Sequence, residues 1–406
     1  MTRTTLWLAV AAMPLISAAS AQAQDDGFGT LLLDVRARHE TVEQTGKLDA
    51  SATTVRTRLG WRSPDWHGVT LLGELENVFA AGSDDGFNSG LNGQTQYASI
   101  SDGSFTELNR LQAGFSPTEG VSVTVGRQYL GFDDGRFVAS AGHRQDKNSH
   151  DALAVSYERG AFDLDYVYHA RINRGPGEDF DWDSDSHLFH LGYDVSEAST
   201  LAGFLYLIDI TEPGREERSN MTWGGRYTGA RNWQDWSVEY ALMYAHQSDY
   251  GSATTDFDLD YIASEIEFGH NGLALNVGYD RIEGDGSTSF SNPLGSNHGF
   301  LGWADAFSGG GRQGTVDGLE DLHAMLSFSR DINTGPFNRL SGGVRRHEFD
   351  ADRTGADLGG EWDVFVTARF EHGVSLSWQF ADYDGPDVAP APADRTKGWV
   401  VLSYAH

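Results

Sequence analysis

Arginine residues at alternating positions are the feature of this sequence best suited to bind a ligand. They recur at a spacing of two or four residues, as Arg36 and Arg38, then Arg56, Arg58 and Arg62, with Arg110 on a later segment. In an extended strand, side chains two residues apart lie on one face. Guanidinium groups bind carboxylates through paired hydrogen bonds. The spacing therefore predicts a ladder of carboxylate-binding groups on one face of neighbouring strands.

An alternative interpretation is that nearby carboxylates neutralise most of this ladder. Glu74 and Glu76 share the predicted face on the intervening segment, where cross-strand ion pairs would bind the arginines. Arg226, Arg345 and Arg369 lie on segments whose neighbours offer fewer such carboxylates. These three residues are the better candidates for positive charge that is available to a ligand.

The segments that carry these residues alternate in polarity with a period of two. Between residues 162 and 171, for example, large apolar side chains on one face alternate with Asp163, Asp165, His169 and Arg171 on the other. Such alternation predicts β-strands with one apolar face. In a membrane-spanning barrel the apolar face contacts lipid and the polar face lines the lumen.

The lengths of the connections favour a barrel over a soluble sandwich. Short connections at 63–68, 116–120, 159–160, 196–198, 269–272 and 372–373 alternate with long acidic ones at 82–104, 131–148, 173–185, 284–318 and 350–358. Short periplasmic turns and long extracellular loops are typical of outer-membrane barrels. The segments number 18, which predicts an all-β fold, a transmembrane antiparallel β-barrel of about 18 strands with both ends on the periplasmic rim. A nineteenth candidate, Arg136–Gln145, is expected to fold inside a loop because it would break this parity.

The N-terminus predicts export of the chain. Arg3, the apolar run Leu6–Ile16 and the small residues before Gln24 form a secretory signal peptide over residues 1–23. Residues 24–406 are expected to form a single outer-membrane β-barrel domain. No later segment has the roughly 18 consecutive apolar residues of a transmembrane helix.

The net charge of −30 argues against nucleic acid as a partner, because no basic patch would neutralise phosphates. The absence of cysteine excludes disulfides and thiolate metal sites. No cofactor is predicted. The repeated carboxylates Asp179, Asp181, Asp183 and Asp185 match a calcium loop only weakly, since Ser184 replaces its glycine and His190 its final glutamate. They are expected to form a solvated outer loop, or one that meets lipopolysaccharide phosphates through divalent ions.

Two stretches resemble the alginate export family of porins. The first contains Val125-Gly126-Arg127-Gln128, Arg136 and Arg144-Gln145; the second runs from Phe290 through Pro293-Leu294 and His298-Gly299-Phe300-Leu301-Gly302-Trp303-Ala304-Asp305 to Phe307. The resemblance implies an 18-stranded barrel whose arginine-lined constriction passes an anionic sugar polymer. It adds Arg127, Arg136 and Arg144 to the candidate binding residues. An uptake porin for acidic oligosaccharides would need the same lumen, so both directions remain open.

The expected partners follow from this location. They are outer-membrane lipid and lipopolysaccharide, an anionic polysaccharide or oligosaccharide as cargo, periplasmic export partners if the cargo leaves the cell, and the barrel-assembly machinery. The last segment, with Gly398, Val400, Leu402 and Tyr404 on one face, resembles the strand that this machinery recognises, although it ends in His406. An enzyme is not predicted. The 14 histidines are scattered, and the sequence contains no G-x-S-x-G, H-E-x-x-H or phosphate-binding motif.

Overall fold

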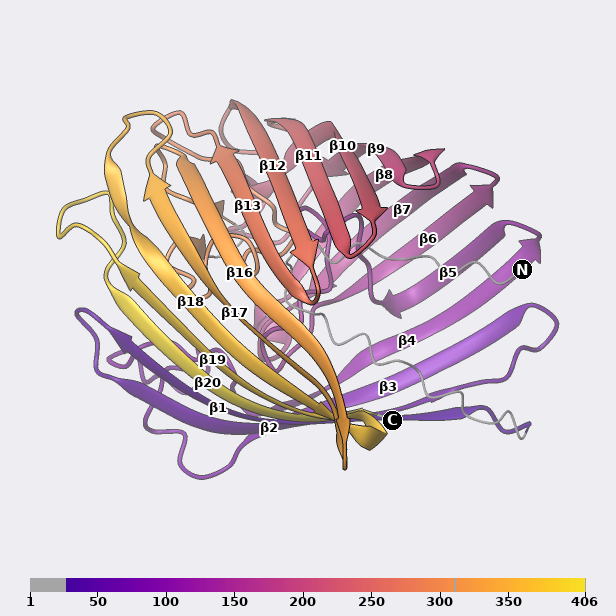
Figure 1. Cartoon of the computed structure of the whole chain (residues 1–406). Coiled ribbons are helices and arrows are strands. Elements are labelled where there is room, and N and C mark those ends of the chain that lie inside the picture. Colours follow the sequence, from indigo (N-terminus) through magenta and orange to yellow (C-terminus); the bar gives the residue numbers. More distant parts are fainter. Residues whose placement is uncertain (1–26, 310–311, 406) are drawn as a thin grey trace.

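The computed structural model describes residues 27–309 and 312–405 and shows a closed antiparallel β-barrel (Figure 1). The 18 strands of its sheet are β1 (Thr30–Gln44), β2 (Ala50–Arg62), β3 (Val69–Ala80), β4 (Phe105–Thr118), β5 (Val121–Gln128), β6 (Ser149–Arg159), β7 (Phe162–Asn173), β8 (Trp182–Ser196), β9 (Ser199–Ile208), β10 (Asn220–Trp233), β11 (Trp236–Ser248), β12 (Asp258–His270), β13 (Leu273–Ile282), β16 (Leu319–Thr334), β17 (Phe337–Asp350), β18 (Asp357–Phe370), β19 (Val374–Asp384) and β20 (Arg395–Ala405). The predicted architecture and strand number are confirmed. The predicted signal peptide and His406 lie outside the described residues.

Small elements lie between these strands. A two-stranded hairpin, β14 (Ser308–Gly309) and β15 (Arg312–Gln313), sits in the longest loop, and three short 3₁₀ turns, η1 (Glu178–Phe180), η2 (Glu216–Arg218) and η3 (Glu371–Gly373), sit in other connections. None of the helical turns in the described parts of the chain is long and apolar enough to cross a membrane.

The barrel closes where the first strand meets the last. β1 pairs with β20 from Asp34 opposite Ala405 to Gln44 opposite Arg395. In Figure 1 the indigo strand β1 accordingly lies beside the yellow strand β20. This closure satisfies the backbone of both edge strands, which a membrane-spanning sheet requires.

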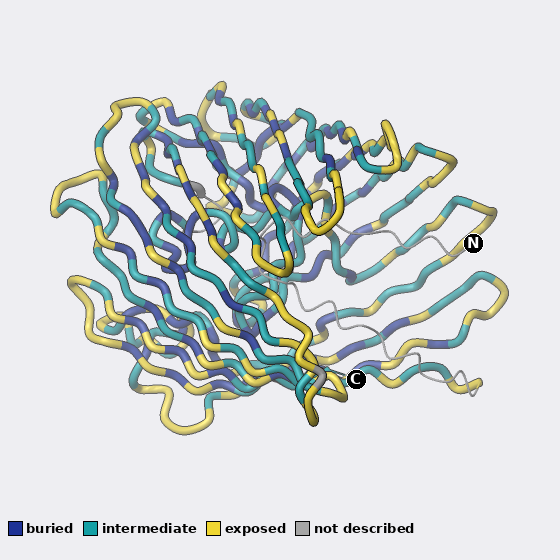
Figure 2. Tube along the Cα trace, viewed as in Figure 1, coloured by how far each residue is buried: buried dark blue, intermediate teal, exposed yellow. Residues whose placement is uncertain are grey.

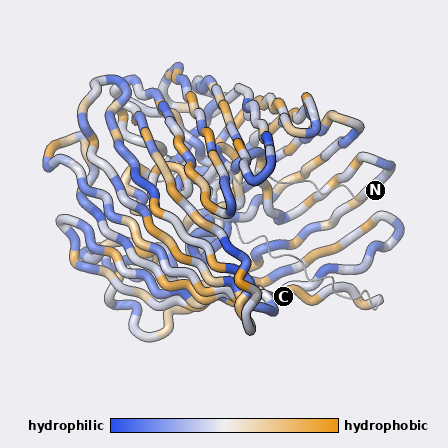
Figure 3. Tube along the Cα trace, in the orientation of Figure 1, coloured by the Kyte–Doolittle hydropathy of each residue, from blue (hydrophilic) through white to orange (hydrophobic). Residues whose placement is uncertain are grey.

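Exposed and buried residues alternate along the strands (Figure 2), and the hydrophobic residues gather on the strands rather than on the turns (Figure 3). Leu59 and Leu75, paired across β2 and β3, are 52% and 56% exposed, whereas their neighbours Arg58 and Glu76 are buried. Large apolar side chains on the outside and charged ones inside are the pattern of a barrel whose outer surface contacts lipid.

Short and long connections lie on opposite rims. Turns such as 119–120, 160–161 and 271–272 join strands at one rim, while the loops 81–104, 129–148 and 283–318 leave the other. Outer-membrane barrels have short turns on the periplasmic side and long loops on the outer side, so the rim with the long loops is the extracellular one. The loop predicted at 173–185 is shorter than expected, because β8 begins at Trp182 and Asp183 and Asp185 therefore belong to a strand.

Two loops fold into the barrel. The inner loop (residues 129–148) contains no barrel strand, which confirms that Arg136–Gln145 lies within a loop. Its Phe137 packs against Phe204, Tyr261 and Phe290. The cover loop (residues 283–318) supplies Phe290 and also Phe307, which packs against the wall. These contacts form a hydrophobic core inside the lumen and narrow it.

Candidate functional site

The predicted arginine ladder lies on strands β1, β2 and β4, and the inner surface of β1 to β4 is here called the arginine wall. Arg36 is paired with Arg56 across β1 and β2, and Arg58 with Glu76 across β2 and β3. Arg38, Arg56 and Arg58 are buried, although an open lumen would leave them in water. The inner loop covers them.

The arginine wall holds this loop through its main chain. Arg36 donates from Nε to Oε1 of Gln145 at 2.8 Å, from Nη1 to the Gly142 carbonyl at 2.9 Å, and from Nη2 to the Arg144 carbonyl. Arg38 donates to the His143 carbonyl at 2.5 Å. Main-chain carbonyls in an irregular buried segment must find donors, and guanidinium groups supply several each.

Gln145 is the centre of this anchorage. Its Nε2 donates to Thr54 Oγ1 at 2.9 Å, its backbone N–H donates to Asp102 at 3.0 Å, and its carbonyl accepts weaker bonds from Arg56 and Arg58 at 3.3 and 3.5 Å. It is fully buried. Sequence reasoning noted Gln145 only as part of the family resemblance and did not predict this role.

The ion pairs expected from the glutamates of β3 are present. Glu74 accepts hydrogen bonds from Arg110 at 2.8 and 3.0 Å, and Glu76 pairs with Arg58. Arg56 pairs in addition with Asp34. Most of the charge on the arginine wall is therefore bound within the protein.

A second anchorage joins the cover loop to the wall at Asp305. This carboxylate lies 2.6 Å from Lys397 Nζ on β20, 2.9 Å from His298 Nδ1 and 3.6 Å from Arg144 of the inner loop. Burial alone would raise the pKa of Asp305, but His298 and Lys397 hold it well below its usual range. The pKa of Asp102 is lowered likewise, because Arg38 and Arg144 outweigh its burial. Both carboxylates stay charged and bind the loops together.

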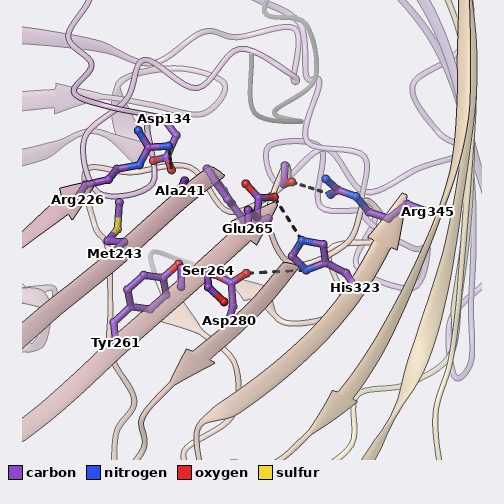
Figure 4. A pocket seen from close by; sticks show the side chains of 13 residues that line it. Asp134, Arg226, Ala241, Met243, Tyr261, Ser264, Glu265, Asp280, His323 and Arg345 are labelled. Carbon is purple, nitrogen blue, oxygen red and sulfur yellow. Dashed lines mark hydrogen bonds and ion pairs between the residues drawn. The ribbon is translucent and has the colours of Figure 1, made fainter. Parts of the chain in front are cut away.

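A pocket lies on another part of the barrel, the pocket wall, formed by β10 to β13, β16 and β17 (Figure 4). Charges of both signs line it: Arg226, Arg345 and His323 face Asp134, Glu265 and Asp280. Arg226 lies 3.3 Å from Asp134 of the inner loop, and Arg345 donates to the Gly299 carbonyl of the cover loop at 3.1 Å. A small solute with both acidic and hydrogen-bonding groups would match this lining.

Arg136 supports the pocket from behind. Its guanidinium is 1% exposed and stacks over Phe300 at 4.5 Å and Tyr261 at 5.1 Å, with Asp280 at 3.6 Å. The side chain is sealed between the inner loop, the cover loop and β12. Arg136 therefore stabilises the side of the pocket against which it packs, and its guanidinium does not reach the lumen.

The remaining predicted residues lie elsewhere. Arg62 and Arg369 point inward near the short-turn rim. Arg127 does not face the lumen as expected: its register partner Leu111 is 57% exposed to the outside, and Arg127 is paired with Asp151 at 2.8 Å on that same face. Alternation along β5 agrees, because Val125 is 52% exposed and Arg127 lies two residues further along the same face.

Two charged groups of the extracellular loops have shifted pKa values, Lys147 near the arginine wall and Asp181 near Arg127 and Arg171. Burial, together with Arg58 and Arg110, lowers the pKa of Lys147 to about 7, and its Nζ lies 3.7 Å from the centre of the Tyr129 ring. Burial raises the pKa of Asp181 to about 6. Among the carboxylates that weakly match a calcium loop, Asp183 pairs with Arg171 at 2.6 Å.

Comparison with known proteins by sequence gives no match, either to a protein-family model or to a curated protein. The resemblance to the alginate export family therefore finds no support there.

Comparison with solved structures is informative about the fold. OpdK of Pseudomonas aeruginosa, crystallised with vanillate, has a TM-score of 0.70 at 13% identity, over 93% of this chain and 98% of that one. OccAB4 of Acinetobacter baumannii has a TM-score of 0.68 at 13% identity, over 94% and 100%. OccK5 of P. aeruginosa has a TM-score of 0.67 at 13% identity, over 93% and 98%. The chain thus has the 18-stranded fold of Gram-negative outer-membrane porins.

Proposed function

We propose that this protein is an outer-membrane porin that takes up small carboxylate-bearing solutes, rather than an exporter of anionic polysaccharide. The observation that carries this proposal is the docking of the inner loop on the arginine wall, which binds the arginines that a passing polymer would need. The narrowed lumen leaves a charged pocket beside Arg226 and Arg345, where a small acid would meet two guanidinium groups.

The chemistry of the pocket favours an acid that also carries hydroxyl or similar groups. Arg226 and Arg345 would attract the carboxylate, and Glu265 and Asp280 would accept hydrogen bonds from hydroxyls. The similar fold of OpdK, which was crystallised with the aromatic carboxylate vanillate, is in keeping with this class of solute. Monomeric sugar acids and aromatic acids are the candidates.

A channel, not an enzyme, is proposed because the best-arranged serine and histidine are inaccessible. His150, His169 and Ser184 form a hydrogen-bonded chain with distances of 3.0 Å, but all three are buried in the wall. A substrate would not reach Ser184 without opening the barrel.

Uptake in proteoliposomes tests the proposal. Vesicles that contain the purified protein should admit glucuronate and vanillate faster than neutral sugars of equal size, and should exclude alginate chains. The same vesicles without protein give the background rate. Passage of alginate through the intact channel, or equal rates for acids and neutral sugars, would contradict it.

A further inference from the structure

A cluster of buried histidines and carboxylates lies beside the pocket, on the inward face of four adjacent strands. Asp321 and His323 are two residues apart on β16, and Asp280 is paired with Asp321 across β13 and β16. His347 on β17 is paired with His323. Strand register therefore brings two imidazoles and two carboxylates together. His323 also lines the pocket, and Figure 4 shows it between Glu265 and Asp280.

The donor atoms are spaced as ligands of one metal ion would be. Asp321 Oδ2 lies 2.9 Å from His347 Nδ1 and 3.4 Å from His323 Nδ1, and Asp280 Oδ2 lies 3.9 Å from His323 Nδ1. One ligand atom from each of Asp321, His323 and His347 falls within 4.8 Å of the others. Ligands bound tetrahedrally at roughly 2.0–2.1 Å lie about 3.4 Å apart, so small side-chain adjustments would complete the site.

The other nitrogen of each imidazole faces a carboxylate outside the cluster. His323 Nε2 lies 3.4 Å from Glu265, and His347 Nε2 lies 3.6 Å from Asp363 of β18. Histidines that bind metals commonly direct their second N–H to such a carboxylate, which orients the ring. Both histidines therefore have the surroundings of metal ligands.

One polar atom of the cluster is poorly satisfied. His323 Nδ1 is buried and lies 3.4 Å from Asp321 Oδ2, which is longer than a well-formed hydrogen bond. Unsatisfied buried groups destabilise a fold unless something else binds them. Five inward carboxylates lie in this region, against three neighbouring arginines, Arg136, Arg226 and Arg345, so carboxylates outnumber arginines here; the carboxylates are Glu265, Asp280, Asp321, Glu361 and Asp363.

We propose that Asp321, His323 and His347, with Asp280 as a fourth ligand, bind a divalent transition-metal ion such as Zn²⁺ in the lumen wall. Imidazole nitrogens favour zinc and similar ions over calcium and magnesium, which prefer oxygen ligands. The ion would join β13, β16 and β17 and place a positive charge at the edge of the pocket. The site depends on the fold alone and not on which solute the channel admits.

Zn²⁺ titration of the folded protein in detergent, after treatment with a chelator and dialysis, tests this proposal. Wild type should bind one equivalent tightly, and the double variant His323→Gln/His347→Gln should bind at least about 100-fold more weakly, since two ligands are lost. His190→Gln is the matched control, because His190 is another buried inward histidine, 3.2 Å from Asp133, and should bind Zn²⁺ as wild type does. No tight equivalent in wild type, or undiminished binding by the double variant, would overturn the site.

A spectrum of the wild-type protein with Co²⁺ covers the case in which the double variant does not fold. Cobalt in a tetrahedral site of nitrogen and oxygen ligands gives intense visible bands, which excess Zn²⁺ should abolish as it takes the site. Bands of this kind that one equivalent of Zn²⁺ removes are the expected result. Only the weak spectrum of hydrated cobalt would refute the proposal.

Discussion

The arginine wall and the pocket wall use the same residue type in opposite ways. On the arginine wall, Arg36 and Arg38 donate to successive main-chain carbonyls of the inner loop, and little of their charge faces solvent. On the pocket wall, Arg226 contacts Asp134 of the inner loop, Arg345 donates to the Gly299 carbonyl of the cover loop, and both line the pocket. A row of arginines in a barrel thus has two distinct uses, to hold a loop or to attract a ligand. The path of the loop decides between them.

The difference has a simple physical origin. The inner loop is irregular where it crosses β1 and β2, so its carbonyls from Gly142 to Gln145 need donors from the wall. Near the pocket wall the loops pack mainly through aromatic rings, as Phe137 does on Phe204 and Tyr261. These ring contacts need no hydrogen-bond donors from arginine.

Removal of the part of the inner loop that docks on the arginine wall should change the channel most. Deleting residues 136–145 should raise the single-channel conductance several-fold and let alginate chains enter, because the lumen widens and the arginine wall becomes exposed. Conductance in planar bilayers measures this. The control is a deletion of the same kind in the loop at 249–257, where Ser252 donates its backbone N–H to Asp209 rather than to the arginine wall. An unchanged conductance in the first variant would show that this loop is not the constriction.

Loss of the pocket arginines should change selectivity rather than pore size. Replacing Arg226, Arg345 and Arg369 together by Gln should lower the anion preference several-fold at nearly constant conductance, since charges that line a narrow lumen act on every ion that passes. Reversal potentials under a salt gradient provide the measurement. The matched variant Arg36→Gln/Arg56→Gln should instead make the current noisy, because it loosens the inner loop. Equal losses of selectivity in both variants would remove the distinction between the two walls.

A smaller effect should appear on changing pH. Lys147, with a pKa of about 7, gains a positive charge as the pH falls, and Asp181, with a pKa of about 6, loses a negative one. Both changes should raise the anion preference between pH 8 and pH 5. Because the pKa of Lys147 is depressed on folding, docking of the loop should also weaken as the pH falls towards 7 from the usual lysine range. Lys147→Met should remove the part of the change in anion preference that occurs near pH 7. A wild-type anion preference that stays constant between pH 8 and pH 5 would contradict the roles given to Lys147 and Asp181.

The smallest effect is expected for a substitution on the outer surface of the barrel. Arg127→Gln should leave selectivity unchanged and cost about 0.5 kcal/mol of stability, the usual scale of a partly exposed ion pair. Heat-modifiability on denaturing gels follows the stability, and reversal potentials follow the selectivity. A clear loss of anion preference would place Arg127 in the lumen and refute the register described here.

The barrel was predictable from sequence because alternation and connection length are local properties. Leu59 and Arg58 differ in polarity wherever the strand lies, and 18 such segments already specify a closed sheet with short turns on one rim. The inward positions of Arg36, Arg58 and Arg345 followed from the same rule. Arg127 was a candidate only through the family resemblance, and the same alternation places it outside with Val125, which is 52% exposed.

The functional use of those positions was not predictable in the same way. The anchoring of Gln145 by Arg36 joins residues more than a hundred positions apart, and no local pattern encodes it. The spacing of Asp321 and His323 was visible as a shared face, but only strand pairing shows that His347 and Asp280 lie beside them. Site assembly depends on register and loop packing, which a single sequence does not reveal.

The pairing of β1 with β20 also bears on how the molecule is made. Every other neighbour in the barrel is joined by a turn or loop, whereas this seam joins Asp34 near one end of the chain to Ala405 near the other. Its formation carries the highest loop-closure entropy of any contact in the sheet, and it cannot occur before the last strand is synthesised. Until then both edges are open to pairing with other chains. The seam is thus the pairing of greatest sequence separation in the sheet, and a barrel in which it has not formed exposes two unpaired strand edges.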